Sequence, residues 1–260
     1  MAIGVLDSGV GGLSVLREVR RTLPREHLLY VADSAYSPYG DRDIASINAR
    51  VDAIADFLVA RGAKAIVVAC NTATGVAVDG LRQRLRLPVV AIEPAVKPAA
   101  RSTRSGRIGV LATSRTLASD RLARLVEAHA SGVDVRMQAC PGLVEQVEAG
   151  DFAGPATRAL VERYVAPLRD AGVDTLVLGC THYPFVAPVI QEVAGSGVAI
   201  VDPSAAVARE LARRLDAAGL LVDSREDGAE EFLTTGDPAR VAPVVGHVWG
   251  RVVTVAHVDI

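Results

Sequence analysis

A repeated order of landmarks constrains the fold of this 260-residue chain more than any other feature. The first landmark is the tetrapeptide IGVL, the second is an apolar run of strand length that ends on a cysteine, and the third is an acidic residue followed by proline. Each occurs twice, 105, 110 and 109 positions apart respectively: residues 3–6 and 108–111, Cys70 and Cys180, and residues 93–94 and 202–203. The agreement in order and spacing indicates two similar structural units.

Apolar segments of strand length alternate with segments of helical periodicity along both halves. Residues 3–6, 28–32 and 65–70 are typical of strands, and residues 41–61 keep the spacing of an amphipathic helix. Strands that alternate with helices are typical of parallel βαβ units. We therefore predict an α/β fold with two similar α/β domains that face one another, each with a mainly parallel sheet, and an active site in the cleft between them.

The domain boundaries are predicted from the same repeat. Residues 204–218 read as a long helix that we expect to pack on the first domain, because the chain after it looks like a final strand, helix and strand. The domain that carries Cys70 and the domain that carries Cys180 are accordingly predicted to comprise residues 1–94 plus 206–260, and residues 95–205.

Composition argues against several functional classes. Aromatic residues make up only 4% of the chain and the formal net charge is −2, which argues against a stacking platform or a basic groove for nucleic acid. The first residues lack the basic start and apolar core of a secretion signal, and no apolar run reaches the length needed to span a bilayer. We expect a cytoplasmic protein that binds neither nucleic acid nor membrane.

The three cysteines are too few and too scattered for a disulfide framework, and no zinc-ligand spacing occurs, so no metal is predicted. Any single free cysteine is by default a small core residue. Cys70 and Cys180, however, each end an apolar strand and are followed by polar residues that suit the start of a helix, where N–H groups and a partial positive charge favour an anion. The pair is therefore a candidate for two working thiols. Cys140 is interpreted as a buried thiol or a loop residue.

Two further side chains are candidates to assist the thiols. His182 can act as acid/base support for Cys180, and Asp7 can do the same for Cys70 or can instead cap the following helix. Thr72 and Thr74 are plausible caps for the helix after Cys70. Two facing thiols predict removal of a proton from one face of a carbon and its return on the other, whereas a single Cys and His dyad predicts a covalent intermediate.

Six motifs, taken in order along the chain, carry a family resemblance: LDSGVGG, PYG, VACNTA, IEPAVKPA, GVLAT and LGCTHYP. Together they resemble the glutamate racemases over essentially the whole length. Aspartate racemases and related isomerases share the twin cysteines but look less similar around PYG and THYP. The resemblance implies two domains related by a pseudo-twofold axis, a homodimer, and a cofactor-independent enzyme that interconverts L-glutamate and D-glutamate to supply D-glutamate for peptidoglycan.

The same resemblance implies roles for individual residues. Cys70 would take the α-proton from D-glutamate and Cys180 from L-glutamate, with Asp7 assisting the first thiol and His182 the second. Glu148 lies where the family has a further carboxylate near the histidine. Besides Asp7 and His182, the positions that match glutamate contacts are Ser8, Pro38, Tyr39, Gly40, Asn71, Thr72, Thr113, Thr116 and Thr181. The proline and glycine of PYG fix a loop whose tip is expected to show the Tyr39 hydroxyl.

Three alternatives stand beside glutamate racemisation. An aspartate racemase or another two-cysteine isomerase would use the same thiols on a different substrate. A hydrolase or transferase would use only Cys180 and His182, as nucleophile and base. An interaction protein that modulates DNA gyrase, as is reported for some racemases of this family, is not encoded in the charge pattern.

Overall fold

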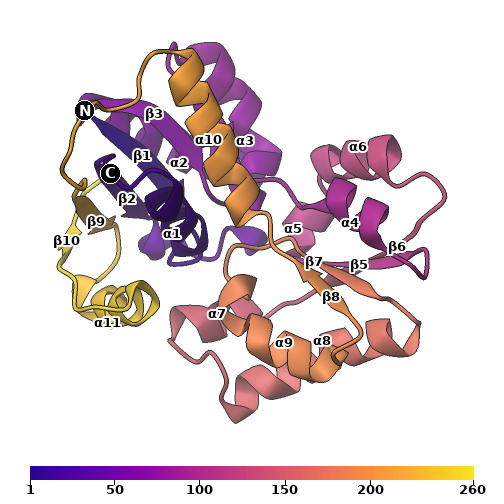
Figure 1. Ribbon diagram of the computed structural model, residues 1–260. Helices are drawn as coiled ribbons and strands as arrows, with labels where there is room; N and C mark the ends of the chain where they lie inside the picture. The colour runs from indigo at the N-terminus through magenta and orange to yellow at the C-terminus, as the bar shows by residue number, and fades with distance from the viewer. The chain divides into compact units, whose positions relative to one another are not determined.

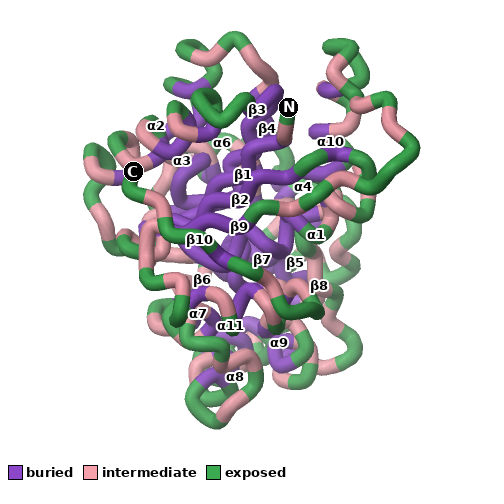
Figure 2. Tube along the Cα trace, turned by 90° about the vertical axis from the view of Figure 1, so that its left-hand side faces the viewer, coloured by how far each residue is buried: buried purple, intermediate pink, exposed green.

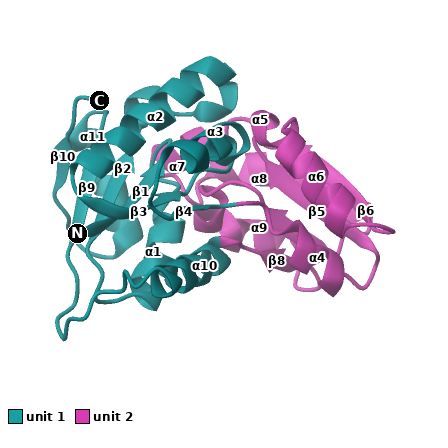
Figure 3. Ribbon diagram, turned by 90° about the horizontal axis from the view of Figure 1, so that it is seen from above, with its two compact units in different colours: residues 1–92, 204–260 teal, residues 93–203 magenta.

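The computed structural model describes residues 1–260 and contains two compact units, coloured separately in Figure 3. Unit 1 comprises Met1–Ile92 and Ser204–Ile260, and unit 2 comprises Glu93–Pro203. The second unit is therefore a continuous segment inserted between the two parts of the first.

Unit 1 is built on a six-stranded sheet in which every pairing is parallel (Figure 1). The strand order is β10-β9-β2-β1-β3-β4. The strands are β1 (Ala2–Asp7), β2 (Leu28–Ala32), β3 (Ala63–Val68), β4 (Val89–Ala91), β9 (Glu230–Thr234) and β10 (Val255–His257). Because β1, β2 and β3 are adjacent and parallel, the residues that follow them meet at one edge of the sheet.

The helices of unit 1 cover both faces of its sheet. Figure 3 shows α2 and α3 on one side of the strands and α1 and α10 on the other. The helices are α1 (Leu13–Thr22), α2 (Ile44–Ala60), α3 (Asn71–Arg84), α10 (Ser204–Ala217) and α11 (Pro238–Trp249). Two short 3₁₀ turns, η1 (Ser34–Tyr36) and η2 (Tyr39–Asp41), lie between β2 and α2. The predicted packing of the long helix on this part of the chain is observed, since α10 lies against α1.

Unit 2 is built on a four-stranded parallel sheet of order β6-β5-β7-β8. Its strands are β5 (Arg107–Ala112), β6 (Asp134–Ala139), β7 (Thr175–Leu178) and β8 (Ala199–Val201). Its helices are α4 (Val96–Ser102), α5 (Ser114–Leu117), α6 (Asp120–His129), α7 (Leu143–Glu148), α8 (Pro155–Asp170) and α9 (Ala187–Ala194), with the 3₁₀ turn η3 (Tyr183–Val186) before α9. Figure 1 shows α4 and α6 on one face of this sheet and α8 and α9 on the other.

The strand orders of the two units explain the repeat in the sequence. The order β2-β1-β3-β4 in unit 1 corresponds to β6-β5-β7-β8 in unit 2, so the four strands of each half occupy equivalent places in their sheets. The predicted fold class, two α/β units with parallel sheets, is confirmed. Unit 1 then adds β9 and β10 beyond β2, where unit 2 has the edge strand β6.

Burial follows this layering. The strands at the centre of the six-stranded sheet are buried almost throughout, as Figure 2 shows for β2 and for β1 after Ala2. In α2 the buried residues Ile47, Val51, Ile54 and Leu58 recur at helical spacing and pack into one core cluster with strands β1 and β3. None of the helices in the chain combines the length and apolar character that a membrane crossing requires.

Local capping moves some predicted boundaries by a few residues. The helix expected over residues 41–61 begins at Ile44, because the carboxylate of Asp43 accepts a hydrogen bond from the Ser46 N–H at 2.8 Å and thereby caps it. The residues just before it form the turn η2 instead.

Candidate active site

Cys70 occupies the N-cap of α3, directly after the strand that ends at Val68. Its Sγ accepts a hydrogen bond from the Ala73 N–H at 3.5 Å and donates to the Ser8 hydroxyl at 3.7 Å. The prediction that Thr72 or Thr74 caps this helix is wrong, because the helix begins earlier, at Asn71, and the cysteine itself is the cap. The thiol therefore lies at the positive end of the helix dipole.

Asp7 is the last residue of β1 and is completely buried. Its Oδ2 accepts a hydrogen bond from the Gly9 N–H at 2.9 Å, which holds the turn that follows the strand. The helix α1 begins later, at Leu13, and no side chain caps it, so the interpretation of Asp7 as the cap of that helix is wrong. A Cβ on Gly12 would lie 2.7 Å from the Asp7 Cβ, so only glycine allows the turn to pass this close to the carboxylate.

Asn71 follows the thiol and is 5% exposed. Neither its side-chain oxygen nor its side-chain nitrogen has a hydrogen-bond partner within the protein. Leaving a buried polar group unpaired costs about 1–3 kcal/mol, so such groups usually serve a ligand or water. Ser8, which accepts a hydrogen bond from Cys70, and Thr72 are also buried, so polar side chains adjoin Cys70 in space and along the chain.

The Tyr39 hydroxyl does not lie at a loop tip. Tyr39 is 1% exposed, and its Oη donates a hydrogen bond to Asp33 Oδ2 at 2.5 Å. The expectation that the loop shows this hydroxyl is therefore wrong. Tyr39 packs in the same core cluster as Cys70, and its neighbours Pro38 and Gly40 lie beside it in the turn before α2.

In unit 2 the second thiol is part of a hydrogen-bonded chain of three side chains. Cys180 Sγ lies 3.7 Å from His182 Nδ1, and His182 Nε2 lies 2.6 Å from Glu148 Oε1. His182 is 1% exposed, while the Glu148 side chain at the end of α7 keeps 20% of its surface exposed. The structure thus brings together the three residues of this unit that were predicted to be catalytic.

Opposing effects act on the protonation of His182. Burial disfavours the charged imidazolium, but the hydrogen bonds to Cys180 and Glu148 favour it and together raise the pKa of His182 well above its usual value of 6.5. A protonated ring can donate to both neighbours, so a positive charge lies between a thiol and a carboxylate. This arrangement can hold or release a proton at Cys180.

Close packing at the end of β7 fixes the place of Cys180. A Cβ on Gly179 would lie 2.9 Å from the Leu111 carbonyl oxygen of the adjacent strand, so the residue before the thiol has no room for a side chain. Hydroxyl groups also gather near the ends of these strands. Thr113 caps α5 by accepting from the Thr116 N–H at 3.2 Å, and Thr116 and Thr181 are both buried.

Comparison with known proteins identifies the family. The family model described as Asp/Glu/Hydantoin racemase matches residues 3–211. The glutamate racemase of Pseudomonas aeruginosa is 54% identical over 96% of this chain and 94% of that protein, and the enzyme of Methylococcus capsulatus is 55% identical over 92% and 88%. The chain belongs to the glutamate racemases of this family. The prediction of an amino-acid racemase is confirmed.

Solved structures of glutamate racemases have the same fold. The crystal structure of isoform RacE1 from Bacillus anthracis covers 100% of this chain and 97% of its own, with 35% identity and a TM-score of 0.91. The Escherichia coli glutamate racemase, solved with L-glutamate and the activator UDP-MurNAc-ala, covers 99% and 98%, with 33% identity and a TM-score of 0.88.

One neighbour of the second thiol in this glutamate racemase was missed in the sequence. Tyr183 is completely buried, and its hydroxyl donates to the Cys140 carbonyl oxygen at 3.5 Å. Burial, with the nearby charge of Cys180, raises the pKa of Tyr183 well above its usual value. The residue stands in the THYP motif, but nothing in the sequence pattern shows that its ring turns inward.

Cys140 is a buried thiol, in agreement with one of the two interpretations of it. Burial raises its pKa to about 12, and its Sγ donates to the Gln138 carbonyl oxygen at 3.5 Å. It therefore stays protonated at neutral pH and differs from a working thiol.

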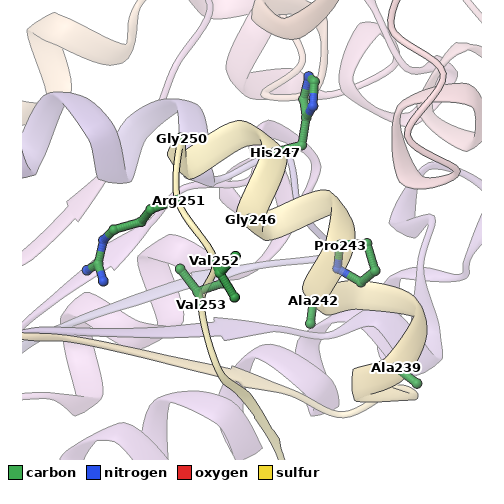
Figure 4. A pocket seen from close by; sticks show the side chains of 9 residues that line it. All are labelled: Ala239, Ala242, Pro243, Gly246, His247, Gly250, Arg251, Val252 and Val253. Atoms are coloured by element: carbon green, nitrogen blue, oxygen red, sulfur yellow. The ribbon is translucent and has the colours of Figure 1, made fainter.

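A separate hollow of about 610 Å³ lies on unit 1 between α11 and the segment after it (Figure 4). It contains none of the candidate site residues. Its lining is mostly apolar: Ala239, Ala242, Pro243, Gly246, His247, Gly250, Arg251, Val252 and Val253.

Proposed function

We propose that this racemase interconverts L-glutamate and D-glutamate without a cofactor, using one thiol on each face of the α-carbon. The observation that carries the proposal is the equivalence of Cys70 and Cys180. They follow β3 and β7. These strands hold the same place in the order β2-β1-β3-β4 of unit 1 and the order β6-β5-β7-β8 of unit 2. The enzyme would act in the cytoplasm as a homodimer and supply D-glutamate for peptidoglycan.

The reaction begins with one cysteine as a thiolate and the other as a thiol, and it ends with these two states exchanged. For L-glutamate, Cys180 removes the α-proton, the electron pair of the C–H bond moves toward the α-carboxylate, and Cys70 returns a proton on the opposite face. A thiol with a pKa near 8.5 is only a few per cent ionised at pH 7, so forming the thiolate costs about 2 kcal/mol before its neighbours act. That cost is small against the barrier of the reaction.

The neighbouring residues have distinct tasks in this proposal. On the Cys180 side, His182 receives or supplies the proton of the thiol, and Glu148 orients the imidazole through its 2.6 Å contact. On the Cys70 side, Asp7 assists the thiol. The substrate binds through Ser8 after β1 and through Asn71 and Thr72 at the start of α3. It also binds through Pro38, Tyr39 and Gly40 of the loop before α2, and through Thr113, Thr116 and Thr181.

Hydrogen exchange tests the proposal directly. The purified protein, incubated with L-glutamate in heavy water without pyridoxal phosphate, should incorporate deuterium at the α-carbon and form D-glutamate. Aspartate in place of glutamate tests the alternative substrate. Absence of exchange with glutamate would refute the proposal.

Serine variants test the need for both thiols. Cys70→Ser and Cys180→Ser should each abolish racemisation, and a mixture of the two should not recover it. A hydrolase or transferase that used only Cys180 and His182 would instead form a covalent adduct on Cys180 and would tolerate Cys70→Ala.

A further inference from the structure

Asp33 occupies a distinctive place at the edge of the sheet that carries Cys70. It follows β2 directly, and its N–H donates to the Asp7 carbonyl oxygen at 3.0 Å. In unit 2 the equivalent residue is Cys140, whose N–H donates to the Ala112 carbonyl oxygen at 3.1 Å. One unit therefore has a buried carboxylate where the other has a buried thiol.

The carboxylate of Asp33 is completely buried and receives four hydrogen bonds. Arg50 donates to both oxygens, from Nη2 at 2.7 Å and from Nε at 3.0 Å, which is the two-point geometry of a strong guanidinium–carboxylate pair. The Thr235 hydroxyl donates at 2.7 Å and the Tyr39 hydroxyl at 2.5 Å. The hydrogen bond to Asp33 also raises the pKa of Arg50, so the guanidinium stays charged.

The geometry of these contacts points to a role for Asp33 beyond folding. We propose that Asp33 is a positioning residue for the racemase reaction: it holds the ring of Tyr39, and with it the loop of Pro38 and Gly40, against Cys70. The proposal rests on the proposed function, because the loop and the thiol are part of the candidate site. The Asp33 carboxylate itself contacts Arg50, Thr235 and Tyr39.

Tyr39 is the donor in its hydrogen bond with Asp33. Burial and then the charge of Asp33 raise the pKa of Tyr39 well above its usual value, so the hydroxyl keeps its proton and donates it to the carboxylate. A phenol has only one hydrogen to donate. The hydrogen bond to Asp33 therefore fixes the position of the Tyr39 ring.

The C-terminal part of the chain supplies two hydrogen-bond partners, one for Asp33 and one for Arg50. Thr235 follows β9, and Nη1 of Arg50 donates to the Ile260 carbonyl oxygen at 2.5 Å. The guanidinium also stacks on the Tyr36 ring, with its Cζ 3.9 Å from the ring centroid. Both C-terminal residues lie outside residues 3–211, which the family model matches. Residues that follow β9 and β10 thus contact Asp33 and Arg50, and Asp33 in turn contacts Tyr39 of the substrate loop.

Kinetics of three variants test the proposal. Asp33→Asn should lower kcat/KM about 10- to 100-fold, since a shift of about 1 Å at a reacting group has effects of this size. Thr235→Val, which removes one donor at nearly constant volume, should lower kcat/KM less. Thr235→Ser, which keeps the hydroxyl, should retain the kcat/KM of the original protein. Tyr39→Phe combined with Asp33→Asn should be no worse than the more damaging single variant, because both remove the same contact.

A second buried ion pair of unit 1 provides the matched control. Lys64 Nζ lies 2.6 Å from Glu26 Oε2, with side chains 5% and 2% exposed. Lys64 lies near the start of β3 and Glu26 lies just before β2, so the pair is at the opposite end of the strands from Asp33. Glu26→Gln should lower the melting temperature as Asp33→Asn does but leave kcat/KM within about twofold of the original. Equal kinetics of Asp33→Asn and the original protein would overturn the proposal.

Thiol labelling separates this proposal from the proposed function. Iodoacetamide labelling followed by peptide mass spectrometry gives the ratio of the rates at Cys70 and Cys180 in one molecule, without turnover. Asp33→Asn should raise the ratio by loosening the packing around Cys70, and Glu26→Gln should not. An unchanged ratio counts against Asp33 as a positioning residue, whereas a protein that never racemises glutamate counts against the proposed function.

Discussion

The two thiols occupy equivalent strand ends but have different surroundings. Cys70 is the N-cap of a 14-residue helix, and its side-chain partner at 3.7 Å is the neutral hydroxyl of Ser8. Cys180 is followed by a turn and the short η3, and its partner at the same distance is the charged His182, backed by Glu148. The two units thus share the place of the sulfur but differ in the groups that stabilise its charge.

The difference indicates how each side manages a proton. A helix N-terminus offers fixed dipoles and N–H groups, which stabilise a negative sulfur but cannot take up a proton. An imidazole can both stabilise the charge and exchange the proton. We therefore expect the Cys180 side to depend more strongly on His182 than the Cys70 side depends on Ser8.

The largest expected effect separates His182 from Ser8. His182→Asn should lower kcat about 10²- to 10³-fold, because it removes an acid/base group. Ser8→Ala should lower kcat only about 2- to 10-fold, the effect of one neutral hydrogen bond. Steady-state rates from both enantiomers measure the two effects, and circular dichroism checks that both variants fold. Equal losses would show that the two thiols depend on their partners to the same degree.

A medium effect is expected for Glu148→Gln, and it depends on pH. The raised pKa of His182 means that its charged form stabilises the folded protein fully below pH 6.5 and that this contribution disappears as the pH rises through the raised value. Loss of the carboxylate should cost about 2 kcal/mol near pH 6. The difference in melting temperature from the original protein should shrink as the pH rises above 6.5 and through the raised pKa. A constant difference would show that His182 is not charged in the folded state.

The smallest effect is expected for Cys140→Ala. A thiol with a pKa of about 12 is protonated at pH 8, so iodoacetamide should label Cys140 last of the three cysteines. The variant should keep kcat within about twofold and lose about 1 kcal/mol of stability, because one buried sulfur is removed. A large loss of kcat would give the third thiol a part in the reaction.

Much of the fold could be predicted because strand pattern and repeat agree. The strand over residues 28–32 coincides with β2, and the paired cysteines marked equivalent strands. The starts of helices were less predictable, because a cysteine is not among the usual capping residues and Cys70 nevertheless caps α3. Which residue caps a helix depends on the contacts made beyond the end of the strand, and the sequence pattern does not show these contacts.

The candidate site was predictable where residues adjoin a motif and not where contacts are long-range. Cys180 and His182 are neighbours in the sequence, and the resemblance pointed to Glu148. The hydrogen bond from Thr235 to Asp33 joins residues 202 positions apart and cannot be predicted from any local pattern. Nor could the pattern show that the Tyr39 hydroxyl points inward, because its partner is chosen by tertiary packing.

The insertion of unit 2 into unit 1 sets an order for synthesis. In a growing chain every residue of unit 2 is made before β9, so the six-stranded sheet lacks β9 and β10 until unit 2 is complete. Until then Asp33 and Arg50 lack Thr235 and the carbonyl of Ile260. The substrate loop beside Cys70 is thus expected to mature only after β9 and the residues that follow it have emerged from the ribosome.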